Sequence, residues 1–174
     1  MKRKLRKLVF SALFAALTCA ATIIIQIPAY MNGYLNLGDC FVLLSGFVLG
    51  PLYGFCAAGI GSCLADIITG YGIYAPASFL IKGLVALIAI YFYNLLMKAI
   101  PKYKRTAIVA SCVVAELFMV IGYFLYAYLI FRQGFSAGVA TIPGNLLQGA
   151  VAVIAFILIK ETLGRIKYLN ILSE

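Results

Sequence analysis

The chain has 174 residues, of which 65% are hydrophobic and 11% charged, and its mean hydropathy is +1.08. A soluble domain carries about 25% charged residues, so this composition excludes an ordinary soluble protein and indicates an integral membrane protein. The net charge of +9 does not indicate nucleic-acid binding, because 12 of the 14 Lys and Arg residues lie in three clusters that flank apolar segments.

Six apolar segments follow one another along the chain and predict an all-α membrane protein, a bundle of six transmembrane helices in one domain over residues 1–174. The predicted spans are about 8–27, 38–50, 52–69, 75–97, 106–130 and 141–160. The first follows a basic stretch, as a signal peptide does, but its length of about 20 residues suits a full span. The second and third are marginal in length, so we expect them to tilt or to lie inside the bundle.

The positions of the basic residues predict the orientation in the membrane. The basic clusters lie at residues 2–7, 98–105 and 160–167. Because positively charged loops stay in the cytoplasm, both termini and the turn at 50–52 are predicted to be cytoplasmic, in a prokaryotic plasma membrane. The loops then predicted to lie outside are 28–37, 70–75 and 131–140, which carry Arg132 as their one positive charge. Tyrosines in the outer loops either anchor lipid headgroups or cover a small-molecule pocket.

Two series of small residues recur at helical spacing. The first predicted helix carries Ala12, Ala16 and Ala20, and the third follows the series Gly50, Gly54, Ala58 and Ser62. Such faces allow another helix to approach closely. We expect internal packing for the third helix, whereas the first is equally suited to docking a separate membrane protein.

A few ionisable residues lie within predicted membrane depth, and a charge there does not persist facing lipid. They are Asp39, Asp66, Lys82 and Glu116. We expect Asp39 to cap the second helix and Asp66 to bond the adjacent loop or a neighbouring helix. Lys82 and Glu116 either form a structural ion pair or share a ligand.

The last three predicted helices add further polar groups. Asn145 and Gln148 share one face of the sixth helix, and Glu116, Tyr123 and Tyr126 lie near one stripe of the fifth. We therefore predict a ligand cleft in the outer half of the bundle. Its candidate ligand-binding residues are Lys82, Glu116, Asn145, Gln148, Tyr71, Tyr74, Tyr123, Tyr126 and Asn36.

These motifs resemble the substrate-binding S components of energy-coupling factor (ECF) vitamin transporters. The resemblance covers almost the whole chain. It rests on the alanine face of the first helix and on "NLGDCFVLLSGFVLGPLYGFCAAGIGSCLADIITGY" (36–71), "YAPASFLIKGL" (74–84) and "IPGNLLQG" (142–149). The set is most similar to members assigned to pyridoxine-type or hydroxymethylpyrimidine-type ligands, without a strong riboflavin or biotin signature.

The resemblance implies a membrane protein that binds a vitamin or precursor from outside and has no ATPase of its own. It implies docking through Ala12, Ala16 and Ala20 onto a transmembrane coupling (T) subunit, which binds two ATP-binding cassette subunits. For a pyridoxine-like ligand, Glu116 would bond the ring nitrogen and Lys82 the phenolate, while Asn145 and Gln148 would bond the hydroxymethyl groups. Tyr71, Tyr74, Tyr123 or Tyr126 would stack on the ring.

Other functions stay open at this point. The chain has no histidine and no metal-like cysteine spacing, so we expect no enzyme activity, metal or cofactor. A self-sufficient secondary transporter or channel, an S component for riboflavin or pantothenate, and a structural scaffold are the alternatives. No inverted repeat supports the secondary transporter.

Overall fold

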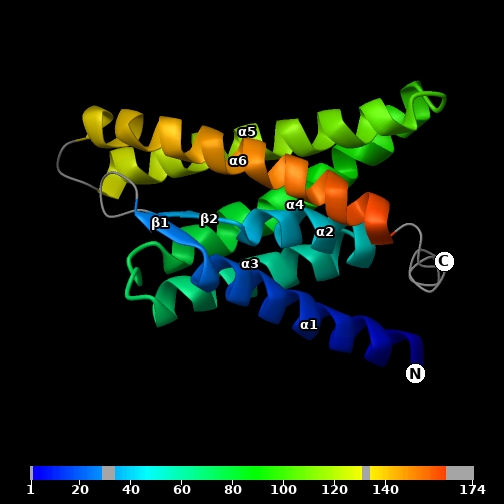
Figure 1. Cartoon of the computed structure of the whole chain (residues 1–174), viewed down its shortest axis with the longest axis horizontal. Helices are drawn as coiled ribbons and strands as arrows, with labels where there is room; N and C mark the ends of the chain where they lie inside the picture. Colours follow the sequence, from blue (N-terminus) through cyan, green and yellow to red (C-terminus); the bar gives the residue numbers. More distant parts are fainter. Residues whose placement is uncertain (1, 29–33, 131–133, 164–174) are drawn as a thin grey trace.

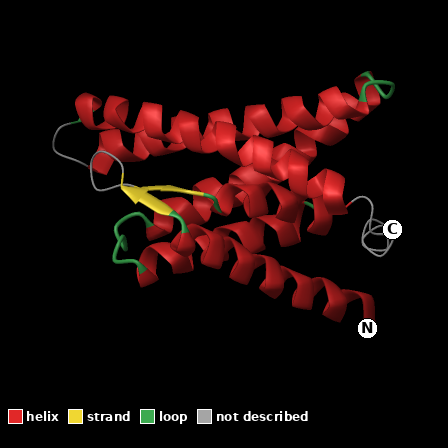
Figure 2. Ribbon diagram, in the orientation of Figure 1, coloured by secondary structure: helices red, strands yellow, loops and turns green. Residues whose placement is uncertain are grey.

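The structure is a computed structural model that describes residues 2–28, 34–130 and 134–163. The elements are α1 (Lys2–Ile24), β1 (Gln26–Pro28), β2 (Tyr34–Asn36), α2 (Gly38–Leu49), α3 (Pro51–Ile68), α4 (Ala75–Ala99), α5 (Lys104–Ile130) and α6 (Phe135–Leu163). Helices make up nearly all of the described chain, as Figure 2 shows, so the predicted all-α fold class is confirmed.

A small antiparallel hairpin, β1–β2, was not predicted from the sequence. It pairs Gln26 with Asn36 and Pro28 with Tyr34, within residues assigned above to the end of the first span and to the outer loop. Pro28 lacks a backbone N–H and cannot continue α1, which ends at Ile24. The hairpin satisfies backbone groups at the point where the chain turns back into the bundle.

The helices differ in their capacity to cross a membrane. Five of them, α1 and α3 to α6, are long and apolar enough by length and composition, whereas α2 has 12 residues. At about 1.5 Å per residue α2 covers roughly 18 Å, well short of a hydrocarbon core of about 30 Å. The expectation that α2 lies inside the bundle is confirmed, because it contacts α1, α3, α4 and α6.

The bundle is layered around α2 and α4. Figure 1 shows α5 and α6 on one side of these two helices and α1 and α3 on the other. Contacts between neighbours follow this order, with α1 against α3, α3 against α4, α4 against α5 and α5 against α6. The core at the centre of the layers includes Val42 and Leu43 of α2, Val85 of α4 and Met119 of α5, all fully buried.

Glycines bring these layers close together. A side chain at Gly46 of α2 would lie 2.3 Å from the backbone oxygen of Ala86 in α4, and one at Gly54 of α3 would lie 2.8 Å from the Cα of Gly46. Buried Ala58 and Ser62 continue the predicted small-residue face of α3, so internal packing there is confirmed. Gly50 instead forms the α2–α3 turn with φ of 82°, a conformation that favours glycine.

The third helix does not lie wholly inside the bundle. Its opposite side exposes Leu52, Ile60, Leu64, Ile67 and Ile68, which suits contact with lipid. Of the two alternatives expected for the third span, tilting or lying inside the bundle, the second does not hold for this face. The physical reason is that the small residues occupy one side of α3 and the large apolar residues the other.

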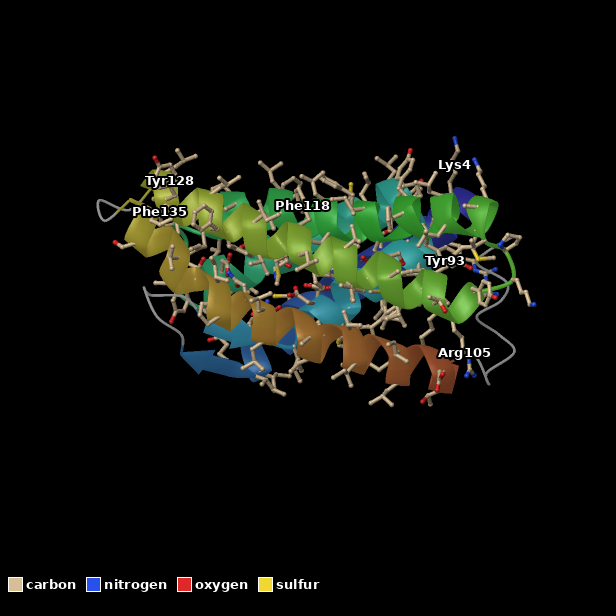
Figure 3. All side chains as sticks on the ribbon, turned by 90° about the horizontal axis from the view of Figure 1, so that it is seen from above. Lys4, Tyr93, Arg105, Phe118, Tyr128 and Phe135 are labelled. Atoms are coloured by element: carbon tan, nitrogen blue, oxygen red, sulfur yellow. The ribbon has the colours of Figure 1, made fainter. Side chains whose placement is uncertain are left out.

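The two ends of the bundle carry different side chains. Figure 3 shows Lys4 and Arg105 at one end and Tyr128 and Phe135 at the other. The start of α1 and the α4–α5 connection lie at the basic end, and the hairpin and the α3–α4 turn lie at the aromatic end (Figure 1). This separation agrees with the predicted orientation; Arg132, Arg165 and Lys167, which also entered that prediction, lie outside the described residues.

Candidate functional site

Lys82 of α4 is buried and forms an ion pair with Asp39 of α2. The Lys82 Nζ lies 2.6 Å from Oδ1 and 2.7 Å from Oδ2 of Asp39, and both side chains are almost completely inaccessible. Lys82 lies seven residues into α4, about 10 Å from its outer end. Asp39 lies in the first turn of α2, where the free backbone N–H groups favour a negative charge. The pair neutralises a charge that the membrane interior otherwise disfavours.

Gln148 of α6 extends this pair towards the hairpin. Its Nε2 donates to Asp39 Oδ2 at 2.6 Å, and its Oε1 accepts from the backbone N–H of Asn36 at 3.1 Å and from Asn36 Nδ2 at 3.4 Å. Asn36 Oδ1 in turn accepts the backbone N–H of Gly38 at 2.8 Å. The amide of Gln148 therefore joins α6, α2 and β2.

The fifth helix contributes Met119 and Tyr123. Lys82 Nζ donates to Met119 Sδ at 2.9 Å, and it lies 5.2 Å from the centre of the Tyr123 ring, a cation–π distance. The Tyr123 hydroxyl shares a hydrogen bond of 2.7 Å with Ser78 of α4. We call Asn36, Asp39, Ser78, Lys82, Met119, Tyr123 and Gln148 the polar junction. It links β2, α2, α4, α5 and α6.

A cluster of tyrosines lies outward of the polar junction. The ring of Tyr74 lies 6.5 Å from that of Tyr123 and 5.7 Å from that of Tyr126, centre to centre. The Tyr126 hydroxyl donates to the backbone oxygen of Ile73. Burial, with smaller effects of Tyr126 and Asp66, raises the pKa of Tyr74 to about 12, so its phenol stays neutral at physiological pH. Tyr71 lies in the turn between α3 and α4, where its backbone N–H donates to the backbone oxygen of Asp66 at 2.8 Å.

The structure excludes one of the two alternatives for Lys82 and Glu116, the ion pair, and contradicts the cap role predicted for Asp39. Lys82 pairs with Asp39 and not with Glu116, because α2 carries its carboxylate between α4 and α6. Asp39 does not cap α2, whose N-cap position is Leu37 without a side-chain hydrogen bond. Asn36 accepts the first-turn N–H of Gly38 instead, which leaves both oxygens of Asp39 for the polar junction.

The other predicted residues divide into two groups. Lys82, Gln148, Asn36 and Tyr123 meet in the polar junction. Glu116 is buried beside it, with 4% of its surface exposed. Asn145 is half-buried one turn before Gln148, and its side chain makes no hydrogen bond to the residues that the structure describes.

Sequence reasoning missed Asp39, Ser78 and Met119 as members of the polar junction. Charge balance could have found Asp39, since a buried ammonium needs a carboxylate and few carboxylates lie at that depth. Ser78 and Met119 carry no such signal, because a serine or methionine in an apolar helix is ordinary. Their roles depend on which side of α4 and α5 faces the ammonium.

The alanines of α1 lie on its outer surface. Ala12, Ala16 and Ala20 are exposed, while Phe14 and Thr18 on the opposite side are buried against the bundle. The side of α1 that packs internally approaches Gly61 of α3, where an added side chain would lie 2.5 Å from the backbone oxygen of Ala15. The alanine face is therefore not used in packing within the described chain.

Three comparisons with known proteins bear on this architecture. Residues 2–165 match the family described as the S component of ECF-type riboflavin transporters. An uncharacterised protein of Pyrococcus woesei is 34% identical over 134 residues, which are 76% of this chain and 84% of that protein. The solved S component of a bacterial ECF transporter superposes with a TM-score of 0.75 over 93% of this chain and 97% of that one, at 22% identity.

The solved S component, at this identity, shows a shared fold, and the family match identifies the class of protein. The sequence prediction of an ECF S component is confirmed at this level, whereas the match does not support a pyridoxine or hydroxymethylpyrimidine subfamily. With nearly the whole chain matched, this protein belongs to the family of S components of ECF-type riboflavin transporters.

Proposed function

We propose that this protein captures a water-soluble vitamin with a flat heteroaromatic ring from outside the cell and delivers it for ATP-driven uptake. The observation that carries the proposal is the buried polar junction, which lies directly inward of the cluster of Tyr74, Tyr123 and Tyr126. The tyrosines offer faces for a ring, and the polar groups offer hydrogen bonds for its substituents.

Two lines of support bear on which vitamin is bound, and they favour different members of this class. The family match favours riboflavin. The sequence resemblance in residues 36–84 and 142–149 favours pyridoxine or hydroxymethylpyrimidine. All three have a flat ring with hydroxyl groups attached, so each suits tyrosines beside amide and charged groups. Riboflavin is the first ligand to test.

Partner subunits complete the proposal. The exposed face of Ala12, Ala16 and Ala20 would dock onto a T subunit bound to two ATP-binding cassette subunits in the plasma membrane. Small side chains allow two helices to approach closely in lipid, where packing drives association. This protein would supply the recognition and its partners the ATP hydrolysis.

Binding by the purified protein tests the proposal. Riboflavin, pyridoxine, hydroxymethylpyrimidine and pantothenate are each added to the protein in detergent, and the unfolding temperature is measured. Riboflavin binding is also followed by its own fluorescence. We expect one of the ring-containing vitamins to raise the unfolding temperature by several degrees at saturation. No shift with any of the four would contradict the proposal.

A pair of tyrosine variants then tests the location of the ring. Tyr126→Leu removes a member of the tyrosine cluster, and Tyr128→Leu removes a more exposed tyrosine two residues further along the same helix. We expect about fivefold weaker binding for Tyr126→Leu, since a lost aromatic contact costs about 1 kcal/mol. Tyr128→Leu should bind like the wild type. Equal effects of the two changes would place the ring elsewhere.

A further inference from the structure

Glu116 is a buried acid whose hydrogen bonds are unmade. It lies near the middle of α5, with 4% of its surface exposed. Neither Oε1 nor Oε2 has a hydrogen-bond partner among the residues that the structure describes. Burying a carboxyl group without hydrogen bonds costs several kcal/mol of folding free energy. The absence of a partner at both oxygens of Glu116 therefore needs an explanation.

The nearby donors are already committed. A lysine ammonium has three N–H donors. Lys82 Nζ donates to Oδ2 of Asp39 and to the sulfur of Met119, and it lies at ion-pair distance, 2.6 Å, from Oδ1 of Asp39. The amide nitrogen of Gln148 donates to Asp39 as well. Lys82 and Asp39 are both close enough to act electrostatically on Glu116. The hydrogen-bond donors of Lys82 and Gln148, however, bind Asp39 and not Glu116.

The side chain of Glu116 packs closely against Gly149 of α6. A side chain at Gly149 would lie 3.0 Å from the Cβ and 3.4 Å from the Oε2 of Glu116. The glycine follows Gln148 directly, so α6 offers a polar group to Asp39 and space to Glu116 at adjacent positions. The two acids thus differ: Asp39 is ion-paired with Lys82 and accepts hydrogen bonds at Oδ2, whereas Glu116 has neither an ion pair nor a side-chain hydrogen bond among the described residues.

We propose that Glu116 is completed by the substrate, whose O–H or N–H groups form hydrogen bonds with its carboxyl oxygens. This inference rests on the proposed function and adds the chemical feature that the site would recognise. Glu116 lies seven residues inward of Tyr123, about 10 Å along α5. A ring held by the tyrosines would therefore reach Glu116 through a substituent that carries donors. In riboflavin these are the hydroxyls of the ribityl chain or, in another orientation, the ring N–H.

Ligand-free stability is the first test, because it needs no ligand. Glu116→Met replaces the acid by an apolar side chain of similar length, and Glu161→Met makes the same change at an exposed acid of α6. If Glu116 is unsatisfied without substrate, Glu116→Met should unfold at the same temperature as the wild type or higher. A fall of several degrees, beyond that of Glu161→Met, would show that Glu116 holds the fold together and would overturn the proposal.

Flavin binding is the second test and uses the same protein in detergent. Riboflavin and lumiflavin, which lacks the ribityl chain, are titrated against the wild type, Glu116→Gln, Glu116→Met and Glu161→Gln. We expect riboflavin to bind at least tenfold more weakly to both Glu116 variants and unchanged to Glu161→Gln. Unaltered lumiflavin binding assigns Glu116 to the ribityl hydroxyls, and an equal loss assigns it to the ring N–H.

The two ways to fail are distinct. Wild-type affinity for riboflavin in both Glu116 variants would overturn the role of Glu116 while the proposed function stands. If the wild type binds no flavin, the titration is made with pyridoxine and hydroxymethylpyrimidine. Absence of binding by the wild type to any of them would overturn the proposed function, and the role of Glu116 in recognition with it.

Discussion

The helices α1 and α2 are neighbours in sequence and in space, but they are buried to opposite extents. Nine of the 12 residues of α2 are buried, including its one acid. The longer α1 buries Phe14, Ala15, Thr18 and Thr22 and leaves its alanine face uncovered. Because α2 is too short to span the membrane, it is enclosed by helices, and its side chains set how those helices fit together. In α1, the alanine face is not covered by the described residues and can contact another protein.

This contrast predicts that equivalent changes have large effects in α2 and small effects in α1. The largest should come from Asp39, since its removal leaves the Lys82 ammonium buried without its counter-ion. We expect Asp39→Leu to destabilise the protein by about 3 kcal/mol or more. Asp39→Leu with Lys82→Met should recover most of the loss, because an apolar pair carries no unpaired charge.

The measurement for this prediction is thermal or denaturant unfolding in detergent, with Lys82→Met alone as the third variant of the cycle. If Asp39→Leu and the double variant are equally unstable, the loss comes from packing around position 39 and not from the charge. That result would weaken the distinction between the polar junction and the rest of α2.

A change of intermediate size is expected at Gly46. An alanine there would place its Cβ 2.3 Å from the backbone oxygen of Ala86, so α2 and α4 would have to separate. Overpacking of this kind costs about 1–3 kcal/mol. Gly72→Ala is the matched control, because a Cβ at Gly72 meets nothing within 4 Å. Unfolding temperatures that do not differ between the two variants would show that the α2–α4 contact tolerates a wider spacing.

The smallest effect on stability is expected on α1. Ala16→Leu adds bulk to an exposed position, so the unfolding temperature of the isolated protein should stay within about 1 °C of the wild type. Association with the proposed T and ATPase subunits should instead fall, as measured by co-purification after co-expression. Ala150→Leu makes the same change on the exposed side of α6 and should leave association intact. Loss of association in both variants would remove the special role of the alanine face.

Much of the fold could be predicted because its signals are local. Apolar length, the breaks at Pro28 and Gly50 and the basic clusters lie within single segments, and they gave helices close to those observed. The hairpin β1–β2 could not be predicted with them, because its pairing of Gln26 with Asn36 joins two short strands without a strong alternating pattern.

The candidate site was predictable as a list of residues but not as a set of contacts. Lys82 and Gln148 stood out because polar groups are rare in apolar helices, and both lie in the polar junction. The sequence predicts their common partner Asp39 as a helix cap, and it leaves open whether Glu116 pairs with Lys82 or shares a ligand with it. The choice between the two acids depends on the rotation of α2 and α5 about their axes, which a single sequence does not give.

By itself, the sequence determined that this is a helical membrane protein, where its helices lie, and which few polar residues are buried in them, because hydrophobicity and helix length act along one segment. Tertiary structure alone decided that Lys82 meets Asp39, 43 positions away, and that Gln148 meets the same acid from 109 positions away. It also decided that α3 buries its small residues while α1 exposes them. Which distant residues meet depends on how whole helices pack against one another. The similar small-residue faces of α1 and α3 are therefore exposed in one helix and buried in the other.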